Sequence, residues 1–243
     1  MTGNRGFKQA KDESLTSDLS FLTTASHELK EPLALVRQLA LALEQGVDAD
    51  EGRRMAQQIA LVSERALRLT TNLTRSSRLE DALFELEPIN PQQICEEVAH
   101  ELTPLYQAKG REIRVTSRHR PILAVANRDL LRRILLNFGD NALHYAQDAS
   151  VEMSTITRSG GDLIRIGVRD FGPAVTPKVW ARLQRQLGST SQPLHHRPQS
   201  SGLGLYIAGR FAEAMNGTIG ASRHRDGASF YVDMRASTQL RLL

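Results

Sequence analysis

The chain has 243 residues, of which 40% are hydrophobic and 24% charged, and its formal net charge is +4 at pH 7. This composition excludes wholesale disorder and fits one large globular domain or two ordinary ones. Because the 31 Lys and Arg residues are scattered along the chain, the positive charge indicates a solvated surface and not a nucleic-acid-binding one.

Cysteine usage and apolar runs bear on the cellular compartment. Cys95 is the single cysteine, which excludes an internal disulfide and favours a reducing compartment. Residues 1–15 contain no apolar signal segment, and no run of about 18 or more apolar residues occurs anywhere. We therefore expect a soluble, cytoplasmic chain without a direct membrane span, and no sensor module is visible in it.

The N-terminal third has the spacing of two amphipathic helices. Two apolar rows lie four positions apart, Leu15, Leu22, Leu29, Val36 and Leu43 in one and Leu19, Leu33 and Ala40 in the other. After the polar link at 44–52, residues 55–73 repeat the pattern, which predicts a second helix that buries one stripe. Because a lone helical hairpin gives each stripe one partner, we expect a homodimer that forms a four-helix bundle.

After Leu83 the chain alternates between helical and strand-like segments, and the run PINP at 88–91 marks the change. Helical periodicity occurs at 94–108, 128–146 and 203–215. Strand-like segments are 112–116, 122–125, 151–157, 163–168, 218–222 and 229–234. We therefore expect two domains, a helical hairpin over 1–83 and an α/β sandwich with its own core over 84–243.

The first candidate site motif is NFGDNALHY at 137–145. Asn137 and Asn141 are four positions apart, so their amides share one face of the predicted helix. An amide oxygen is a neutral ligand that suits magnesium held against phosphates. On this motif alone, two surface polar residues are an equally good interpretation.

Two further motifs contain glycines near a strand end and a helix start. In VRDFGPA at 168–174, Asp170 ends a strand and Gly172 follows it. A carboxylate there can accept the exocyclic amine of adenine, and the glycine lets backbone approach the ring. In SSGLGLYIAGRF at 200–211, Gly202 and Gly204 open a helix whose N–H groups and dipole favour phosphate; such a glycine pair is a weak signal by itself.

Together with SHELKEP at 26–32, these motifs resemble the sensor histidine kinases of two-component systems in their order and spacing. The resemblance extends from about Phe21 to Met234. It implies that residues 1–83 form the dimerisation and phosphoacceptor domain, and that residues 84–243 form a catalytic ATP-binding domain of the Bergerat type. It also implies ATP and Mg²⁺ as cofactors and the receiver domain of a response regulator as partner.

The resemblance assigns roles to individual residues. His27 accepts the γ-phosphoryl group of ATP, and Glu28 takes the ring proton and fixes the tautomer. Asn137 acts in catalysis and nucleotide binding, and Asn141 binds nucleotide and is the expected magnesium ligand. The remaining nucleotide-binding residues are His144, Tyr145, Asp170, Gly172, Gly202, Leu203 and Gly204. Gly227, in the turn before the last strand, is expected to be structural.

Some positions depart from the family pattern. Glu31 occupies the place where the family usually has Thr or Asn to orient water during dephosphorylation, so we expect weak phosphatase activity. His144 stands where Lys is usual, and Ala174 and Ser200 replace glycines. The segment 188–202 is rich in Ser, Gln and Pro and is expected to act as a mobile lid over the nucleotide.

Two other functions compete with the kinase. Chaperone-like and gyrase-like ATPases share the nucleotide-binding fold but carry Glu at the position of Asn137, whose amide accepts no proton at neutral pH. Such water-activating ATPases are therefore disfavoured, and no motif indicates a basic DNA-associated ATPase. A dimeric scaffold or phosphotransfer protein with a degenerate ATP-binding domain remains the main alternative.

Overall fold

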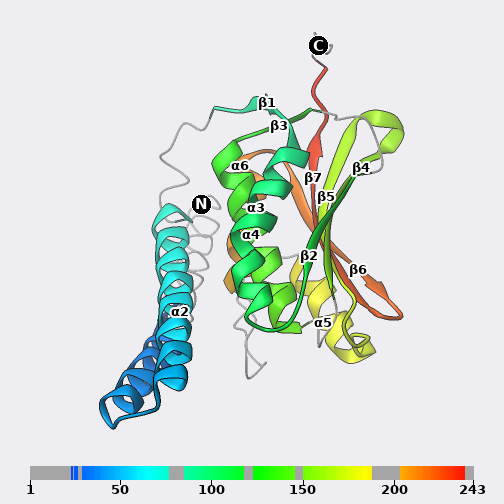
Figure 1. Cartoon of the computed structure of the whole chain (residues 1–243). Helices are drawn as coiled ribbons and strands as arrows, with labels where there is room; N and C mark the ends of the chain where they lie inside the picture. The colour runs from blue at the N-terminus through cyan, green and yellow to red at the C-terminus, as the bar shows by residue number, and fades with distance from the viewer. Residues whose placement is uncertain are drawn as a thin grey trace, which may run out of the picture. The chain divides into compact units, whose positions relative to one another are not determined.

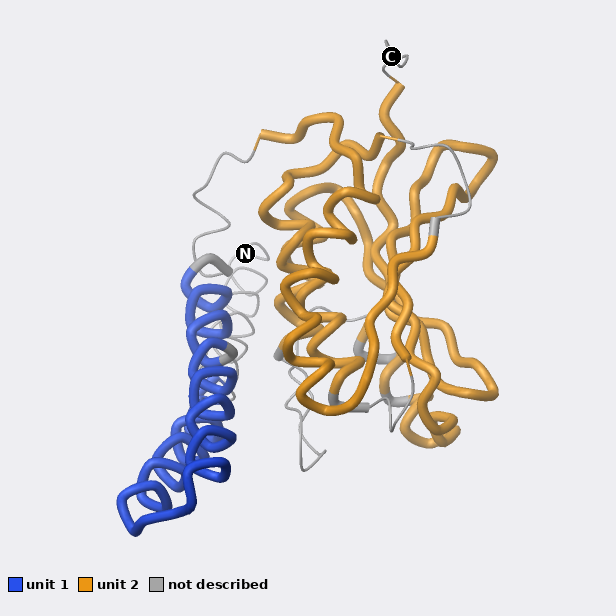
Figure 2. The backbone as a smooth tube through the Cα atoms, in the orientation of Figure 1, with its two compact units in different colours: residues 1–77, 191–203 blue, residues 78–190, 204–243 orange. Residues whose placement is uncertain are grey.

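The computed structural model describes residues 23, 25–26, 29–76, 85–117, 123–145, 150–187 and 203–238. The chain divides into two compact units, residues 1–77 with 191–203 and residues 78–190 with 204–243 (Figure 2). The predicted boundary between Leu83 and Phe84 lies outside the described residues. The domain limits 1–83 and 84–243 therefore stay a prediction.

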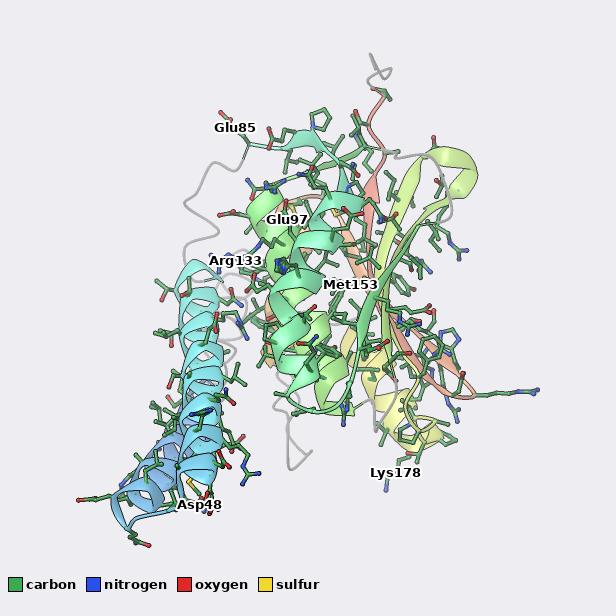
Figure 3. All side chains as sticks on the ribbon, in the orientation of Figure 1. Asp48, Glu85, Glu97, Arg133, Met153 and Lys178 are labelled. Carbon is green, nitrogen blue, oxygen red and sulfur yellow. The ribbon has the colours of Figure 1, made fainter. Side chains whose placement is uncertain are left out.

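The first unit contains two helical segments joined by a short turn (Figure 1). Residues 29–44 are helical, and α2 spans Ala49–Ser76. The Oδ1 atom of Asp48, labelled in Figure 3, accepts the backbone N–H groups of Asp50 at 3.1 Å and Glu51 at 2.9 Å. This N-cap fixes the start of α2. The second predicted helix is confirmed, and the part of the first that the structure describes is helical; the predicted link at 44–52 was too long, because α2 begins at Ala49 after the Asp48 cap.

The apolar stripes of the first unit are incompletely covered. Leu29, Val36 and Leu43 of the first predicted row are half-buried. By contrast, Leu33 of the second row is 60% exposed, and Leu67 of α2 is 68% exposed. Large apolar side chains thus face solvent in the single chain, while the predicted dimeric four-helix bundle stays a prediction.

A mixed sheet of five strands in the order β2-β4-β5-β7-β6 forms the base of the second unit. β2 and β4 are parallel, and the other neighbouring strands are antiparallel. A separate antiparallel pair joins β1 (Glu87–Ile89) to β3 (Ala124–Ala126). The strands of the main sheet are β2 (Ile113–Ser117), β4 (Val151–Arg158), β5 (Leu163–Asp170), β6 (Thr218–His224) and β7 (Gly227–Arg235).

Helices cover one face of this sheet (Figure 1). They are α3 (Pro91–Gln107), α4 (Arg128–Tyr145) and α6 (Leu203–Ala214), while α5 (Pro177–Leu187) follows β5 and contacts β6. The side chain of Asn90 caps α3 through the N–H of Gln92, and that of Asn127 caps α4 through the N–H of Leu130. No described helix is both long enough and apolar enough to cross a membrane.

The core of the second unit lies between the helices and the covered face of the sheet. Ile164, Ile166 and Val168 alternate along β5 and are buried on that face, and Met153 of β4 is fully buried (Figure 3). Asp170 continues the same alternation at the end of β5. The register of β5 therefore turns Asp170 toward the helix-covered side.

The predicted α/β layering is confirmed, with shifts at the element ends. α4 and α6 each end one residue before the predicted limit. α3 begins at Pro91 and not at Ile94, because Asn90 caps it and Pro91 suits the first turn of a helix. β1 was not predicted from the sequence, and Pro88 occupies the middle position of this three-residue strand.

Candidate nucleotide-binding site

The paired asparagines of α4 lie against the first turn of α6. The side-chain nitrogen of Asn137 donates a hydrogen bond to the carbonyl oxygen of Gly204 at 3.3 Å. A Cβ atom built on Gly204 would lie 3.9 Å from Cγ of Asn137 and 3.9 Å from Nδ2 of Asn141. The structure thus brings Asn137 and Asn141 next to Gly204, which follows Asn137 by 67 positions in the sequence.

The start of α6 adds backbone donors to this cluster. α6 begins at Leu203, so Gly204 lies in its first turn. The N–H groups of a first helical turn have no partner within the helix, and the helix dipole places partial positive charge there. The two amides of α4 and the start of α6 together form a surface that suits a phosphate group.

Asp170 is a nearly buried acid at the end of β5, with 5% of its surface exposed. Its Oδ1 atom accepts the backbone N–H groups of Gly172 and Ala228, each at 3.2 Å. Burial raises the pKa of this carboxyl group, and the hydrogen bonds from Gly172 and Ala228 offset part of that increase. The two backbone donors hold the carboxyl group in one orientation, which suits recognition of a ligand amine.

The turn between β6 and β7 closes over Asp170. Gly227 has a φ of +115°, and a Cβ atom on it would lie 2.3 Å from the carbonyl oxygen of Asp170 and 2.5 Å from its Oδ1 atom. Any side chain at position 227 would therefore displace Asp170 or the turn. The sequence predicted a structural role for Gly227 but not its contact with Asp170; the Asp-Gly pair at 226–227 was the available signal for a tight turn.

Arg169 ties the same turn to the end of β5. It donates hydrogen bonds to Oδ1 of Asp226 at 2.7 Å and to the carbonyl oxygen of Asp170 at 3.1 Å. Its guanidinium carbon lies 4.6 Å from the ring centroid of Phe171. The hydrogen bond from Arg169 lowers the pKa of Asp226. Sequence reasoning gave no role to Arg169 or Asp226, because their contact depends on strand register.

The predicted site residues fall into three sets. The described side chains form two clusters on the helix-covered side, Asn137 and Asn141 with Gly204, and Asp170 with Gly172. Residues 144 and 145 end α4, and residue 203 begins α6. His27, Glu28 and Gly202 lie outside the described residues, as does the whole of the predicted lid at 188–202. The functional roles of all these residues stay predictions.

The two clusters together offer the groups that a magnesium nucleotide requires. Asp170 supplies an acceptor for an amine, and the start of α6 supplies donors for phosphate. The amide oxygen of Asn141 is a suitable neutral ligand for Mg²⁺, which prefers oxygen and takes further ligands from phosphate and water. The donor set therefore fits a magnesium ion that arrives with its nucleotide.

Comparison with known proteins agrees with this geometry. Residues 126–238 match the family described as "Histidine kinase-, DNA gyrase B-, and HSP90-like ATPase". The chain is 26% identical over 239 residues to the sensor histidine kinase AruS of Pseudomonas aeruginosa, covering 93% of this chain and 24% of AruS. It is 24% identical over 222 residues to the sensor histidine kinase YcbM of Bacillus subtilis, covering 89% of this chain and 71% of YcbM.

Solved structures share the fold along most of the chain. Full-length ShkA in complex with AMPPNP gives a TM-score of 0.61 at 22% identity, covering 92% of this chain and 47% of ShkA. Histidine kinase ThkA in complex with response regulator protein TrrA gives 0.63 at 14% identity, covering 98% of this chain and 68% of that one. The chain therefore resembles the sensor histidine kinases over most of its length, and residues 126–238 are similar to the histidine kinase-, DNA gyrase B- and HSP90-like ATPases.

Proposed function

We propose that this chain is a protein histidine kinase that phosphorylates itself on His27 with ATP and passes the phosphoryl group to an aspartate of a response regulator. The main observation that supports this function is that Asn137 and Asn141 lie next to Gly204, within the segment that matches the histidine kinase-like ATPase family. The chain spans 24% of the length of AruS and 47% of the length of ShkA. The kinase activity is therefore proposed from the part of those proteins that the chain matches.

The nucleotide is held at both ends in this proposal. The Asp170 carboxylate accepts the exocyclic amine of adenine, while the amides of α4 and the first turn of α6 face the phosphates. ShkA, which shares this fold, was solved in complex with the nucleotide AMPPNP, and this supports an ATP site in the present chain. Asn137 supports kinase over water-activating ATPase chemistry, because its amide accepts no proton at neutral pH.

Magnesium is the proposed cofactor, held by the amide oxygen of Asn141. When bound, the ion would neutralise charge on the phosphate oxygens. The chain's own contribution is to orient Asn141 through α4 and to keep Asn137 on Gly204, so that the phosphates meet donors at fixed positions. Such positioning and charge stabilisation supply most of the catalysis in phosphoryl transfer.

His27 is the proposed nucleophile, on the basis of its place in the SHELKEP motif. A bond forms between the unprotonated ring nitrogen of His27 and the γ-phosphorus, the bond from that phosphorus to the bridging oxygen breaks, and ADP leaves. Glu28 accepts the proton of the other ring nitrogen and thereby stabilises the product imidazole. Neutral imidazole already has a free lone pair, so this step needs no strong base.

The hairpin domain is proposed to be a homodimer with limits near residue 83. The exposure of Leu33 and Leu67, 60% and 68%, supports a second copy that covers them. Burial of two such side chains in each copy would stabilise a four-helix bundle by several kcal/mol, at about 1.5–3 kcal/mol per leucine. Residues 84–243 would then form the catalytic domain.

The proposed partner is the receiver domain of a response regulator. The ThkA structure holds a response regulator protein, TrrA, and this chain shares its fold over 98% of its length. We place the reaction in the cytoplasm because ATP, its phosphoryl donor, is abundant there.

Equilibrium binding tests the nucleotide site on which the proposed kinase activity depends. A fluorescent ATP analogue should bind the wild-type chain in the presence of magnesium and be displaced by ATP. Asn141→Ala should weaken this binding at least about tenfold, since a metal ligand is lost. The buried control Ile94→Val of α3 should leave the affinity unchanged. Absence of binding by the wild type would refute the kinase and favour the scaffold.

A further inference from the structure

Two hydrogen bonds join the C-terminal end of α3 and the segment after it to α4. The hydroxyl of Tyr106 donates to the carbonyl oxygen of Gly139 at 2.8 Å, and Nη1 of Arg111 donates to the carbonyl oxygen of Leu143 at 2.6 Å. Tyr106 is fully buried. The two acceptors are four positions apart, so they lie on one face of α4.

Close packing reinforces this contact at Gly139. A Cβ atom built on Gly139 would lie 2.3 Å from Cδ1 of Leu102, which is fully buried in α3. Glycine is disfavoured in a helix interior, and here it permits α3 to approach α4 closely. We call Leu102, Tyr106 and Arg111, with Gly139 and Leu143, the α3 seam.

The α3 seam lies on the side of α4 opposite the two site asparagines. Each helical residue turns the chain by about 100°, so residue 139 points about 200° away from residues 137 and 141. Asn137 and Asn141 face Gly204 of α6. A rotation or axial shift of α4 that breaks the α3 seam therefore also changes the position of both amides relative to α6.

We propose that Tyr106, Arg111 and Gly139 are positioning residues that set the rotation of α4 and thereby the nucleotide affinity of the site, an inference that rests on the proposed function. None of the three needs to touch the nucleotide. Burial raises the pKa of the Tyr106 hydroxyl, so this group stays protonated and remains a donor over the working pH range.

Tyr106→Phe isolates the hydroxyl, because the ring and its packing remain. The Kd for the fluorescent ATP analogue should rise about two- to twelvefold, the range that corresponds to loss of one hydrogen bond if its full free energy passes to the site. Ile94→Val removes a methyl group from the same helix and is the matched control. It should lower the thermal midpoint without raising the Kd.

Arg111 provides a second variant that leaves the buried core intact. Arg111→Ala should raise the Kd, and Arg111→Lys should restore most of the affinity because it keeps a cationic donor for the Leu143 carbonyl. Gly139→Ala should raise the Kd as well, since Leu102 must move to admit the methyl group. Equal affinities in Arg111→Ala and Arg111→Lys would contradict a hydrogen-bonding role for Arg111.

A double-mutant cycle tests whether the seam acts through the amides. If Tyr106 acts by positioning Asn141, then Tyr106→Phe should weaken binding little further in an Asn141→Ala background. Full additivity of the two losses, or a wild-type Kd in Tyr106→Phe, would overturn the positioning role while leaving the proposed function intact. Failure of the wild-type chain to bind nucleotide would instead refute the proposed function.

Discussion

A Cβ atom on residue 227 would lie 2.3 Å from the carbonyl oxygen of Asp170, so Gly227 and Asp170 can hold their places only because residue 227 is glycine. Gly227→Ala should destabilise the chain by about 2–4 kcal/mol, from backbone strain at positive φ and from overpacking. It should also weaken nucleotide binding, because Asp170 must shift. Denaturant unfolding and titration with the fluorescent ATP analogue measure the two effects.

Gly160 provides the matched control for this substitution. It also has a positive φ, +67°, but a Cβ atom on it would meet nothing within 4 Å. Gly160→Ala should therefore lose only about 1 kcal/mol to backbone strain and bind nucleotide with wild-type affinity. Equal affinity losses in Gly160→Ala and Gly227→Ala would contradict the link between Gly227 and Asp170.

Asp170→Asn should change the stability of the fold and the affinity for nucleotide in opposite directions at neutral pH. The folded-state pKa of Asp170 is raised above its ordinary value of 3.8. Its protonated form thus stabilises the fold below about pH 3.8, and this stabilisation is lost as pH rises through the raised pKa. The Asn variant cannot ionise, so its stability relative to wild type should improve from pH 4 to pH 7.

Nucleotide affinity should move in the opposite direction for Asp170→Asn. A hydrogen bond to a charged group contributes about 1.5–3 kcal/mol, so its loss should weaken binding roughly tenfold or more. Thermal unfolding across pH and analogue titration at pH 7 provide the two readouts. Unchanged affinity in the variant would exclude Asp170 as the adenine acceptor.

His224 gives the fold a second pH dependence. Burial and the nearby Arg169 lower the pKa of His224 from its ordinary value of 6.5. Its neutral form therefore stabilises the fold above about pH 6.5, and that stabilisation is lost as pH falls through the lowered pKa. His224→Gln should reduce the dependence of the thermal midpoint on pH between pH 7 and pH 5. Parallel plots of thermal midpoint against pH for the variant and the wild type would contradict this account.

Helix positions and paired amides could be predicted from sequence, because local periodicity determines both. The apolar spacing of residues 128–146 gave α4 to within one residue, and the four-residue spacing of Asn137 and Asn141 placed their amides on one face. Gly204 was predicted from its place at the start of α6. These features depend on neighbours within one or two helical turns.

Contacts that depend on strand register and helix packing could not be predicted. Arg169 meets Asp226 across 57 positions, and Tyr106 meets Gly139 across 33. Such pairs form only once β5, β7 and the helices are assembled. No local residue pattern near either partner predicts them. The short strand β1 was missed because three residues carry no period.

Glu31 should limit the phosphatase activity toward a phosphorylated receiver domain. It is exposed on the helix that spans residues 29–44, and a carboxylate near an aspartyl phosphate repels it and cannot donate a hydrogen bond to water. Glu31→Asn should raise phosphate release from a phosphorylated cognate receiver about tenfold, which equals roughly 1.4 kcal/mol of barrier. Glu44→Asn in the same helix is the control, and fast release that depends on Glu31 would refute the prediction.

Incubation of the full chain with ATP labelled at the γ-phosphate tests the central claim most directly. The wild type should acquire a label that is labile in acid and stable in base, as a phosphohistidine is, and His27→Gln should abolish it while still binding the ATP analogue. A wild type that binds nucleotide yet acquires no label would contradict the kinase. A label that persists in His27→Gln would contradict His27 as the phosphoacceptor.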